Sequence, residues 1–87
     1  MLWTDLEAGD VIRIKDEVAQ IFHNDRGSVV WNNCDKDLTI VKVVIKHGYI
    51  GVYVGNFKVP FHIDINGFVD WVDYRGILFD IVSLKEN

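Results

Sequence analysis

The chain has 87 residues, of which 49% are hydrophobic and 25% are charged, and its formal net charge is −4. This length predicts one small domain over residues 1–87, and the apolar content excludes a disordered chain. No apolar run approaches the ~20 residues of a membrane-spanning helix, and the single cysteine excludes an intrachain disulfide. No basic segment leads into an apolar one at the start, so we expect no signal peptide and a cytoplasmic protein.

The charged residues are mixed along the chain, with nine Lys and Arg against thirteen Asp and Glu. Nucleic-acid binding depends on clustered cations that neutralise phosphates, and a membrane-surface role needs a basic amphipathic helix. Neither feature is visible in the sequence. The composition therefore favours another protein with a basic surface as the partner, with nucleic acid as the weaker alternative and no membrane role.

A single helical turn is predicted at the start of the chain. Thr4 and Glu7 have the spacing of a capping box, in which each side chain accepts a hydrogen bond from the other residue's backbone N–H. Gly9 fits the left-handed residue that ends such a turn. Residues 11–15 then alternate, with isoleucines on one face and basic residues on the other, which predicts a strand.

The segment after this strand is less regular. Residues 16–27 fit a helical turn, a strand or a long loop equally well. Residues 28–31 are predicted to form a short strand. The polar residues 32–37 are predicted to form an exposed loop.

The middle of the chain predicts three strands joined by two-residue turns. Residues 38–46, 49–54 and 57–65 are rich in β-branched and aromatic residues. His47–Gly48 and Gly55–Asn56 are the expected turns between them.

Alternation assigns faces to two of these strands. Val41, Val43 and Ile45 share one face of the first strand, and its two lysines share the other. Pro60 lacks a backbone donor, so the third strand is expected at a sheet edge or with a bulge. The apolar face of that third strand is predicted to hold Phe57, Val59, Phe61, Ile63 and Ile65.

The end of the chain predicts two further strands. Asn66–Gly67 is a strong hairpin signal, because a type I′ turn needs positive φ at both central residues. Residues 68–74 are expected to return as a strand, Arg75–Gly76 to turn, and residues 77–84 to form the last strand.

Six or seven short strands in series predict a mostly β fold, namely a small antiparallel barrel with one helical turn at the start. One open sheet would leave two long exposed edges, whereas a barrel removes them.

The first residues also resemble a known architecture. The segment Asp5–Ile14, with the sequence DLEAGDVIRI, resembles the first strand of many SH3-like barrels, including KOW-type and translation-factor-like domains. The later Arg26–Val30 looks like their second strand. This resemblance implies that the predicted small barrel is SH3-like, and it implies architecture and not function. The chain lacks the Ala-Leu-Tyr-Asp-Tyr-type segment and the paired tryptophans of peptide-binding SH3 domains, so binding of proline-rich ligands is not implied. It is acidic, whereas RNA-binding KOW domains are usually basic.

The residues that could carry chemistry do not form a recognisable active site. His62 and Asp64 have the His-x-Asp spacing of iron oxygenases, but no second histidine follows them, so no metal site is expected. Cys34 lies beside aspartate, which raises a thiol pKa and disfavours a nucleophile. Asp70 and Asp73, together with Asp64, follow no active-site spacing. We expect no catalytic residue, no cofactor and no enzymatic activity.

The segment 59–74 is the strongest candidate for a binding surface. It combines three aspartates with interleaved aromatic residues and contains no Lys or Arg. Trp and Tyr are favoured interface anchors, and the acids would steer a basic partner. The alternative is that Trp71 covers a barrel end and the aspartates keep an edge soluble. The predicted partner patch consists of Asp64, Phe68, Asp70, Trp71, Asp73 and Tyr74.

We therefore expect a non-enzymatic protein–protein interaction module, such as a phage-type or accessory regulator or inhibitor that docks on a larger host protein. The alternative is a DNA mimic or a nucleic-acid-associated barrel. Direct nucleic-acid binding would require basic residues of different strands to converge, and an unpaired edge strand could also form a homodimer. The basic residues concerned are Arg13, Lys15, Lys42, Lys46 and Lys58.

Overall fold

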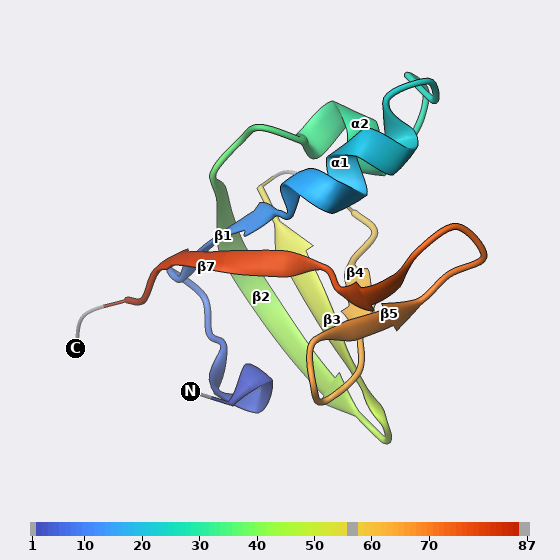
Figure 1. The fold of residues 1–87 in the computed structure, drawn as a ribbon. Coiled ribbons are helices and arrows are strands. Elements are labelled where there is room, and N and C mark those ends of the chain that lie inside the picture. The colour runs from blue at the N-terminus through green and yellow to red at the C-terminus, as the bar shows by residue number, and fades with distance from the viewer. Residues whose placement is uncertain (1, 56–57, 86–87) are drawn as a thin grey trace.

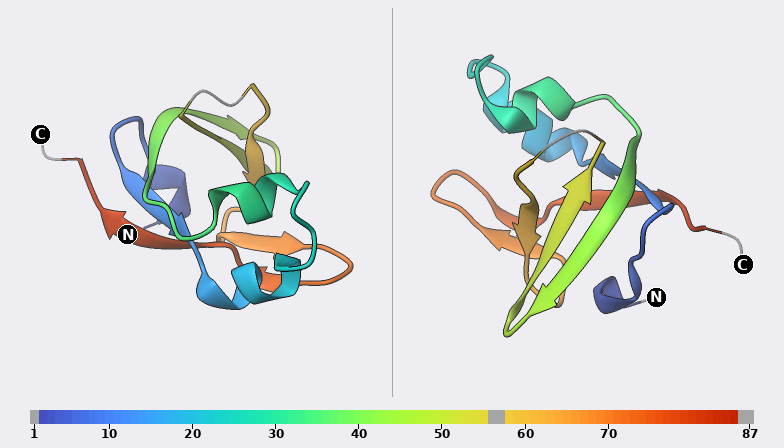
Figure 2. Two further views of the ribbon diagram at one scale, coloured as in Figure 1. Left: turned by 90° about the horizontal axis from the view of Figure 1, so that it is seen from above. Right: turned by 180° about the vertical axis from the view of Figure 1, so that it is seen from behind.

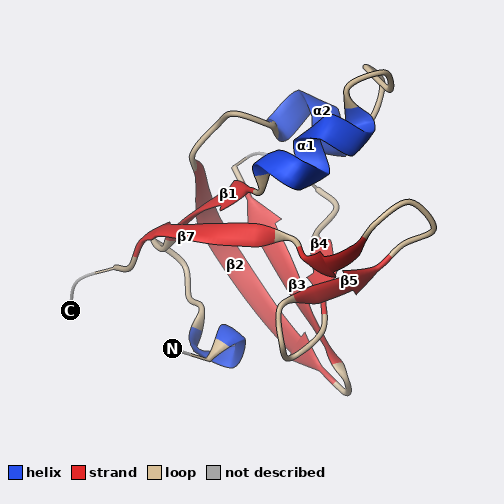
Figure 3. Cartoon of the chain, in the orientation of Figure 1, coloured by secondary structure: helices blue, strands red, loops and turns tan. Residues whose placement is uncertain are grey.

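The computed structural model describes residues 2–55 and 58–85 and shows a mostly β fold with three short helices (Figures 1 and 3). A five-stranded antiparallel sheet has the order β4-β3-β2-β1-β7, and β5 pairs with β6 in a second sheet. The elements are η1 (Trp3–Asp5), β1 (Val11–Ile14), α1 (Asp16–Phe22), α2 (Val29–Asn33), β2 (Leu38–Lys46), β3 (Tyr49–Val54), β4 (Phe61–Ile63), β5 (Phe68–Asp70), β6 (Arg75–Ile77) and β7 (Phe79–Ser83).

The predicted mostly β, antiparallel class is confirmed, but the strand pairing does not close into a barrel. Within residues 2–55 and 58–85, β4 and β7 are the two edges of the larger sheet. The fold is compatible with a small barrel-like domain because the two sheets enclose a common apolar core. No helix in these ranges is long and apolar enough to cross a membrane.

The start of the chain differs from the predicted capping box. The 3₁₀ helix η1 begins at Trp3, so Thr4 lies inside the turn and cannot cap it. The carboxylate of Asp5 accepts a hydrogen bond from the backbone N–H of Leu2 at 3.2 Å. Gly9 has the expected positive φ, at 99°. In β1 the predicted alternation is confirmed, since both isoleucines are fully buried.

The region between β1 and β2 is helical. Residues 16–27, which the sequence left open, form α1 and a turn. The predicted strand at residues 28–31 is wrong: the Ser28 hydroxyl accepts hydrogen bonds from the N–H groups of Val30 and Trp31, at 3.0 and 3.4 Å, and caps α2. The expected exposed loop 32–37 is partly wrong: Asn33 ends α2 and is buried, as is Cys34, whereas Asn32 and residues 35–37 are exposed.

The β2–β3 hairpin matches the prediction in both strands and in the His47–Gly48 turn. The predicted shared face of β2 is partly wrong. The register shifts between Ile40 and Lys42, which is a bulge, and Val41 is 52% exposed. Val43 packs against the core, whereas Ile45 is exposed near the turn, where the hairpin extends beyond the core (Figure 1).

The third predicted strand is shorter than expected. Only Phe61–Ile63 form β4, which is a sheet edge as Pro60 predicted. Phe57 lies outside the described residues, and Val59 and Ile65 are exposed and not inward-facing. The turn before β5 is not type I′, since Gly67 has a φ of 82° but Asn66 has no positive φ.

The β5–β6 hairpin corrects the predicted end of the chain. β5 stops at Asp70, and Arg75–Gly76 lies within β6 and forms no turn. The turn consists of residues 71–74, where the N–H of Trp71 donates to the carbonyl of Tyr74 at 2.9 Å. The expected strand 77–84 is interrupted by the fully buried Leu78, which separates β6 from β7.

The core lies between the two sheets and beneath the helices. Phe79 of β7 meets Phe61 of β4 edge to face, with ring centroids 5.5 Å apart. Val18 of α1 and Val30 of α2 close the core at the end where the helices lie (Figure 1). At the opposite end Trp3 packs over Gly67, where a Cβ would lie 2.4 Å from the indole.

Candidate functional site

The two large aromatic side chains of the predicted partner patch point toward the core. Trp71 packs edge to face on Phe22 of α1, with ring centroids 5.7 Å apart. The Tyr74 hydroxyl donates a hydrogen bond to the carbonyl of Ile77 at 2.7 Å. Burial, and then the charge of Glu17, raise the pKa of Tyr74. Both rings therefore hold the 71–74 turn against the rest of the fold.

The acidic members of the predicted patch have different surroundings. One carboxylate oxygen of Asp64 accepts hydrogen bonds from the N–H groups of Asn66 and Phe68, at 2.8 and 2.9 Å, and so stabilises the turn before β5. Asp70 forms an exposed ion pair with Arg75 at 2.8 Å. Asp73 and the Phe68 ring are exposed. The structure thus gives the six residues separate roles and does not place them around one hollow.

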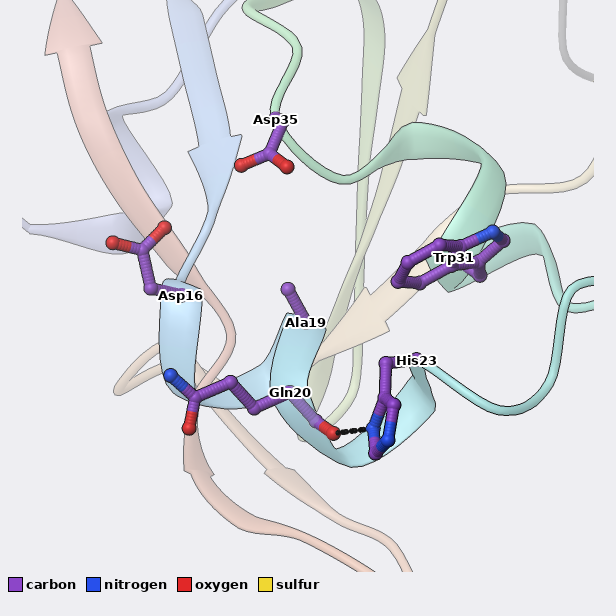
Figure 4. Close-up of a pocket in the computed structure, with 6 residues that line it drawn as sticks. All are labelled: Asp16, Ala19, Gln20, His23, Trp31 and Asp35. Carbon is purple, nitrogen blue, oxygen red and sulfur yellow. Dashed lines mark hydrogen bonds between the residues drawn. The ribbon is translucent and has the colours of Figure 1, made fainter.

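A hollow of about 360 Å³ lies between α1 and α2 (Figure 4). We call it the α1–α2 hollow. Its walls combine two carboxylates, an amide, an imidazole and an indole. The Asp35 carboxylate points into the space, and the rings of Trp31 and His23 lie together at the side away from Asp16 (Figure 4). The lining residues are Asp16, Ala19, Gln20, His23, Trp31 and Asp35.

The helical spacing of α1 supplies one wall of this hollow. Asp16, Gln20 and His23 are four and three residues apart, which places them along one face of a helix. Between them Ala19 contributes only a methyl group and leaves space. α2 supplies Trp31 from the other side, and its orientation depends on the Ser28 cap.

Asp35 reaches the hollow because of its backbone conformation. Its φ is 57°, the left-handed region that few residues other than glycine adopt and that aspartate tolerates. The chain reverses here directly after α2 and leads into β2. Arg13 lies 3.6 Å from Asp35 and 3.4 Å from Asp37, so one cation is shared between two exposed carboxylates. Such exposed ion pairs contribute little to the free energy of folding.

The chemistry of the hollow suits a positively charged group. An indole face attracts a cation, and two carboxylates add to this attraction. His23 donates from Nδ1 to the backbone carbonyl of Gln20 at 2.5 Å. Among residues 2–55 and 58–85, no three His, Cys, Asp or Glu side chains are grouped to hold a metal ion.

The other residues considered for chemistry lie elsewhere. Cys34 is buried, and its thiol donates to the Val30 carbonyl at 3.0 Å. Burial, with a smaller contribution from Asp35, raises the pKa of this thiol. His62 contacts Tyr49 edge to face at 5.1 Å, while the Asp64 carboxylate caps a turn.

Sequence reasoning missed the α1–α2 hollow because it depends on two segments whose conformation was left open or predicted wrongly. The one available signal was the helical spacing of residues 16, 20 and 23.

The comparisons with family models, curated proteins and solved structures found no match to this chain. The class that the fold and hollow define is thus a mostly β domain with an acidic, aromatic surface hollow.

Proposed function

We propose that the protein is a non-enzymatic protein-interaction module that holds a basic side chain of a larger partner protein in the α1–α2 hollow. The observation that carries the proposal is that Trp31 and the carboxylates of Asp16 and Asp35 line the same hollow. A Lys or Arg side chain could place its charge between these carboxylates and its stem against the indole. The size of the chain fits an accessory or phage-type regulator or inhibitor of that partner.

The hollow is a better candidate than the predicted patch at residues 64–74. Trp71 and Tyr74 pack inward and Asp64 stabilises a turn, which leaves Phe68, Asp70 and Asp73 as the outward part of that patch.

We also propose an SH3-like relationship for the fold. It is supported by the Gly-Asp turn that leads into β1 and by the antiparallel pairing of β1 with β7.

The test uses the three tryptophans as separate reporters, because each indole N–H gives its own NMR signal. The ¹⁵N-labelled protein is titrated with a short unstructured peptide that contains Lys and Arg. A peptide of equal length that contains Glu is the control. We expect the Trp31 signal to move with the basic peptide, while the signals of Trp3 and Trp71 stay in place.

Two variants locate the binding site. Asp16→Asn combined with Asp35→Asn should weaken binding about fivefold, since each exposed ion pair contributes roughly 0.5 kcal/mol. Asp73→Asn removes the same kind of charge from the predicted patch and should leave affinity unchanged. If the Trp71 signal moves instead and Asp73→Asn weakens binding, the patch is the docking site. If no indole signal responds to the basic peptide, the proposal is wrong.

A further inference from the structure

The outer side of the β2–β3–β4 sheet collects lysines and rings on one surface. Lys42 is paired with Tyr53 and Lys46 with Tyr49 across β2 and β3, and His62 of β4 is paired with Gly51 of β3. Residues paired in this way have side chains on the same face. We call this surface the basic–aromatic face. It consists of Lys42, Lys46, Tyr49, Tyr53 and His62.

The opposite side of the same strands is the core. Ile50 and Val52 of β3 and Phe61 and Ile63 of β4 are buried there. The basic–aromatic side chains therefore point away from the core, and all of them are exposed except the half-buried Tyr53. Seen from behind the view of Figure 1, β2 and β3 lie across the front of the molecule (Figure 2, right).

The bulge in β2 is responsible for part of this face. Leu38 and Ile40 point into the core, so unbroken alternation would also turn Lys42 inward. The extra residue Val41 shifts the phase by one position, and Lys42 comes to lie opposite Tyr53. Its ammonium lies 5.4 Å from the centroid of the Tyr53 ring.

The charge around this face differs from that of the chain as a whole. Residues 38–63 contain three lysines, two histidines and no Asp or Glu, which gives a formal charge of +3 within a chain of −4. The nearest acids in sequence are engaged elsewhere. Asp37 lies 3.4 Å from Arg13, and Asp64 accepts two backbone hydrogen bonds in its turn.

We propose that the basic–aromatic face binds single-stranded nucleic acid. Lysines neutralise phosphates, and tyrosine and histidine rings stack on unpaired bases. Neighbouring strands lie about 4.8 Å apart, so the outer two of these three strands lie about 10 Å apart. Aromatic side chains on the sheets of RNA-binding domains stack two or three bases in this way. A basic protein partner is disfavoured here by charge, and a duplex keeps its bases out of reach of the rings. This proposal is independent of the function proposed for the α1–α2 hollow.

The test measures fluorescence anisotropy of a labelled ten-residue oligothymidine on adding the full chain. We expect binding at 50 mM salt and a loss of roughly sevenfold at 200 mM, as expected for two phosphate contacts on a single strand. Lys42→Gln combined with Lys46→Gln should remove most of this salt dependence. Lys36→Gln, at an exposed lysine outside the face, is the matched control and should lose less than twofold.

Stacking is tested at Tyr49, which is 41% exposed and lies beside the His47–Gly48 turn. Tyr49→Ala should weaken binding at least fivefold. Tyr49→Phe keeps the ring and should retain wild-type affinity. Circular dichroism of both variants shows whether a loss of binding arises from unfolding. The lysine variants test the same face without substituting an aromatic residue.

Three results would overturn the proposal. The first is an absence of any anisotropy change at 50 mM salt. The second is duplex DNA that binds as tightly as the single strand. The third is a poly-glutamate peptide that competes as well as unlabelled oligothymidine, which would identify an acidic protein as the partner. The Asp16→Asn and Asp35→Asn variant should bind oligothymidine within twofold of wild type, so the two proposals fail separately.

Discussion

The helical end and the outer side of the β2–β3–β4 sheet have opposite electrostatic character within one small chain. Residues 16–37 carry five acids and two bases, whereas residues 38–63 carry three lysines and no acid. The helical end has a hollow between two short helices, and the sheet has an open face of aligned side chains. The overall charge of −4 averages over both regions and describes neither. Inferences from net charge therefore need the placement of the charges on the fold.

The largest expected effect tests whether the two regions share one cooperative unit. Phe79 is fully buried and meets Phe61 of β4, so it contributes to the core beneath both regions. Phe79→Ala should cost about 3–5 kcal/mol in the free energy of unfolding. This is a large part of the roughly 4–13 kcal/mol expected for a chain of this length. Chemical denaturation followed by circular dichroism measures the loss.

Hydrogen exchange of the same variant checks the shared core directly. Both the helical end and the sheet should lose protection together in Phe79→Ala. The milder Phe79→Leu serves if the alanine variant does not fold. Loss of protection in only one region would show that the regions unfold independently.

The second prediction concerns the packing contact between the helical end and the β5–β6 hairpin. Trp71→Ala removes the contact with Phe22 and should cost about 2 kcal/mol in the free energy of unfolding, because the indole is half-buried against the core. Trp71→Phe keeps an aromatic edge and should cost less than half as much. Thermal and chemical unfolding give the values. A variant of full stability that lost partner binding would instead favour the predicted patch.

The third prediction separates the two binding surfaces through a helix cap. Ser28→Ala removes the acceptor for the N–H groups of Val30 and Trp31 and should cost about 1 kcal/mol. The substitution should weaken binding of the basic peptide in the α1–α2 hollow and leave oligonucleotide binding unchanged. Ser83→Ala, at an exposed serine that ends β7, is the control. Equal losses in both binding assays would contradict the separation of the surfaces.

The smallest expected effect is a loss of stability at alkaline pH. The pKa values of Cys34, Tyr74 and Lys15 are all raised in the fold, the first two by burial and the third by its hydrogen bond to Asp80. For a raised pKa, the stabilisation is complete below the unfolded value and is lost as the pH rises through the folded value. Stability should therefore decline above about pH 9, with the Cys34 thiol first.

Amide hydrogen exchange between pH 8 and pH 10.5, corrected for the intrinsic rates, distinguishes the regions. Protection of α2 should fall first, because Cys34 follows this helix directly and donates to its Val30 carbonyl. Cys34→Ala should delay that fall. A simultaneous loss in β3 would show that the thiol is not the cause.

The sequence by itself determined the strands whose local pattern agrees with their tertiary environment. β1, β2 and β3 alternate or are rich in β-branched residues, Gly48 permits the hairpin turn between the latter two, and Pro60 restricts β4 to an edge. These features depend on sterics and hydrogen bonds within a few residues. The antiparallel, mostly β class followed from them.

Only the tertiary structure decided the placement of the candidate sites. Residues 28–31 are apolar enough for a strand, and the helix that forms there instead depends on the Ser28 cap and on packing of Val30 in the core. The α1–α2 hollow needs this helix beside α1, and the basic–aromatic face needs the bulge at Val41 to turn Lys42 outward. Strand register and helix packing join residues far apart in the chain, and a one-residue change of register exchanges the two faces of a strand. A local pattern does not contain that information.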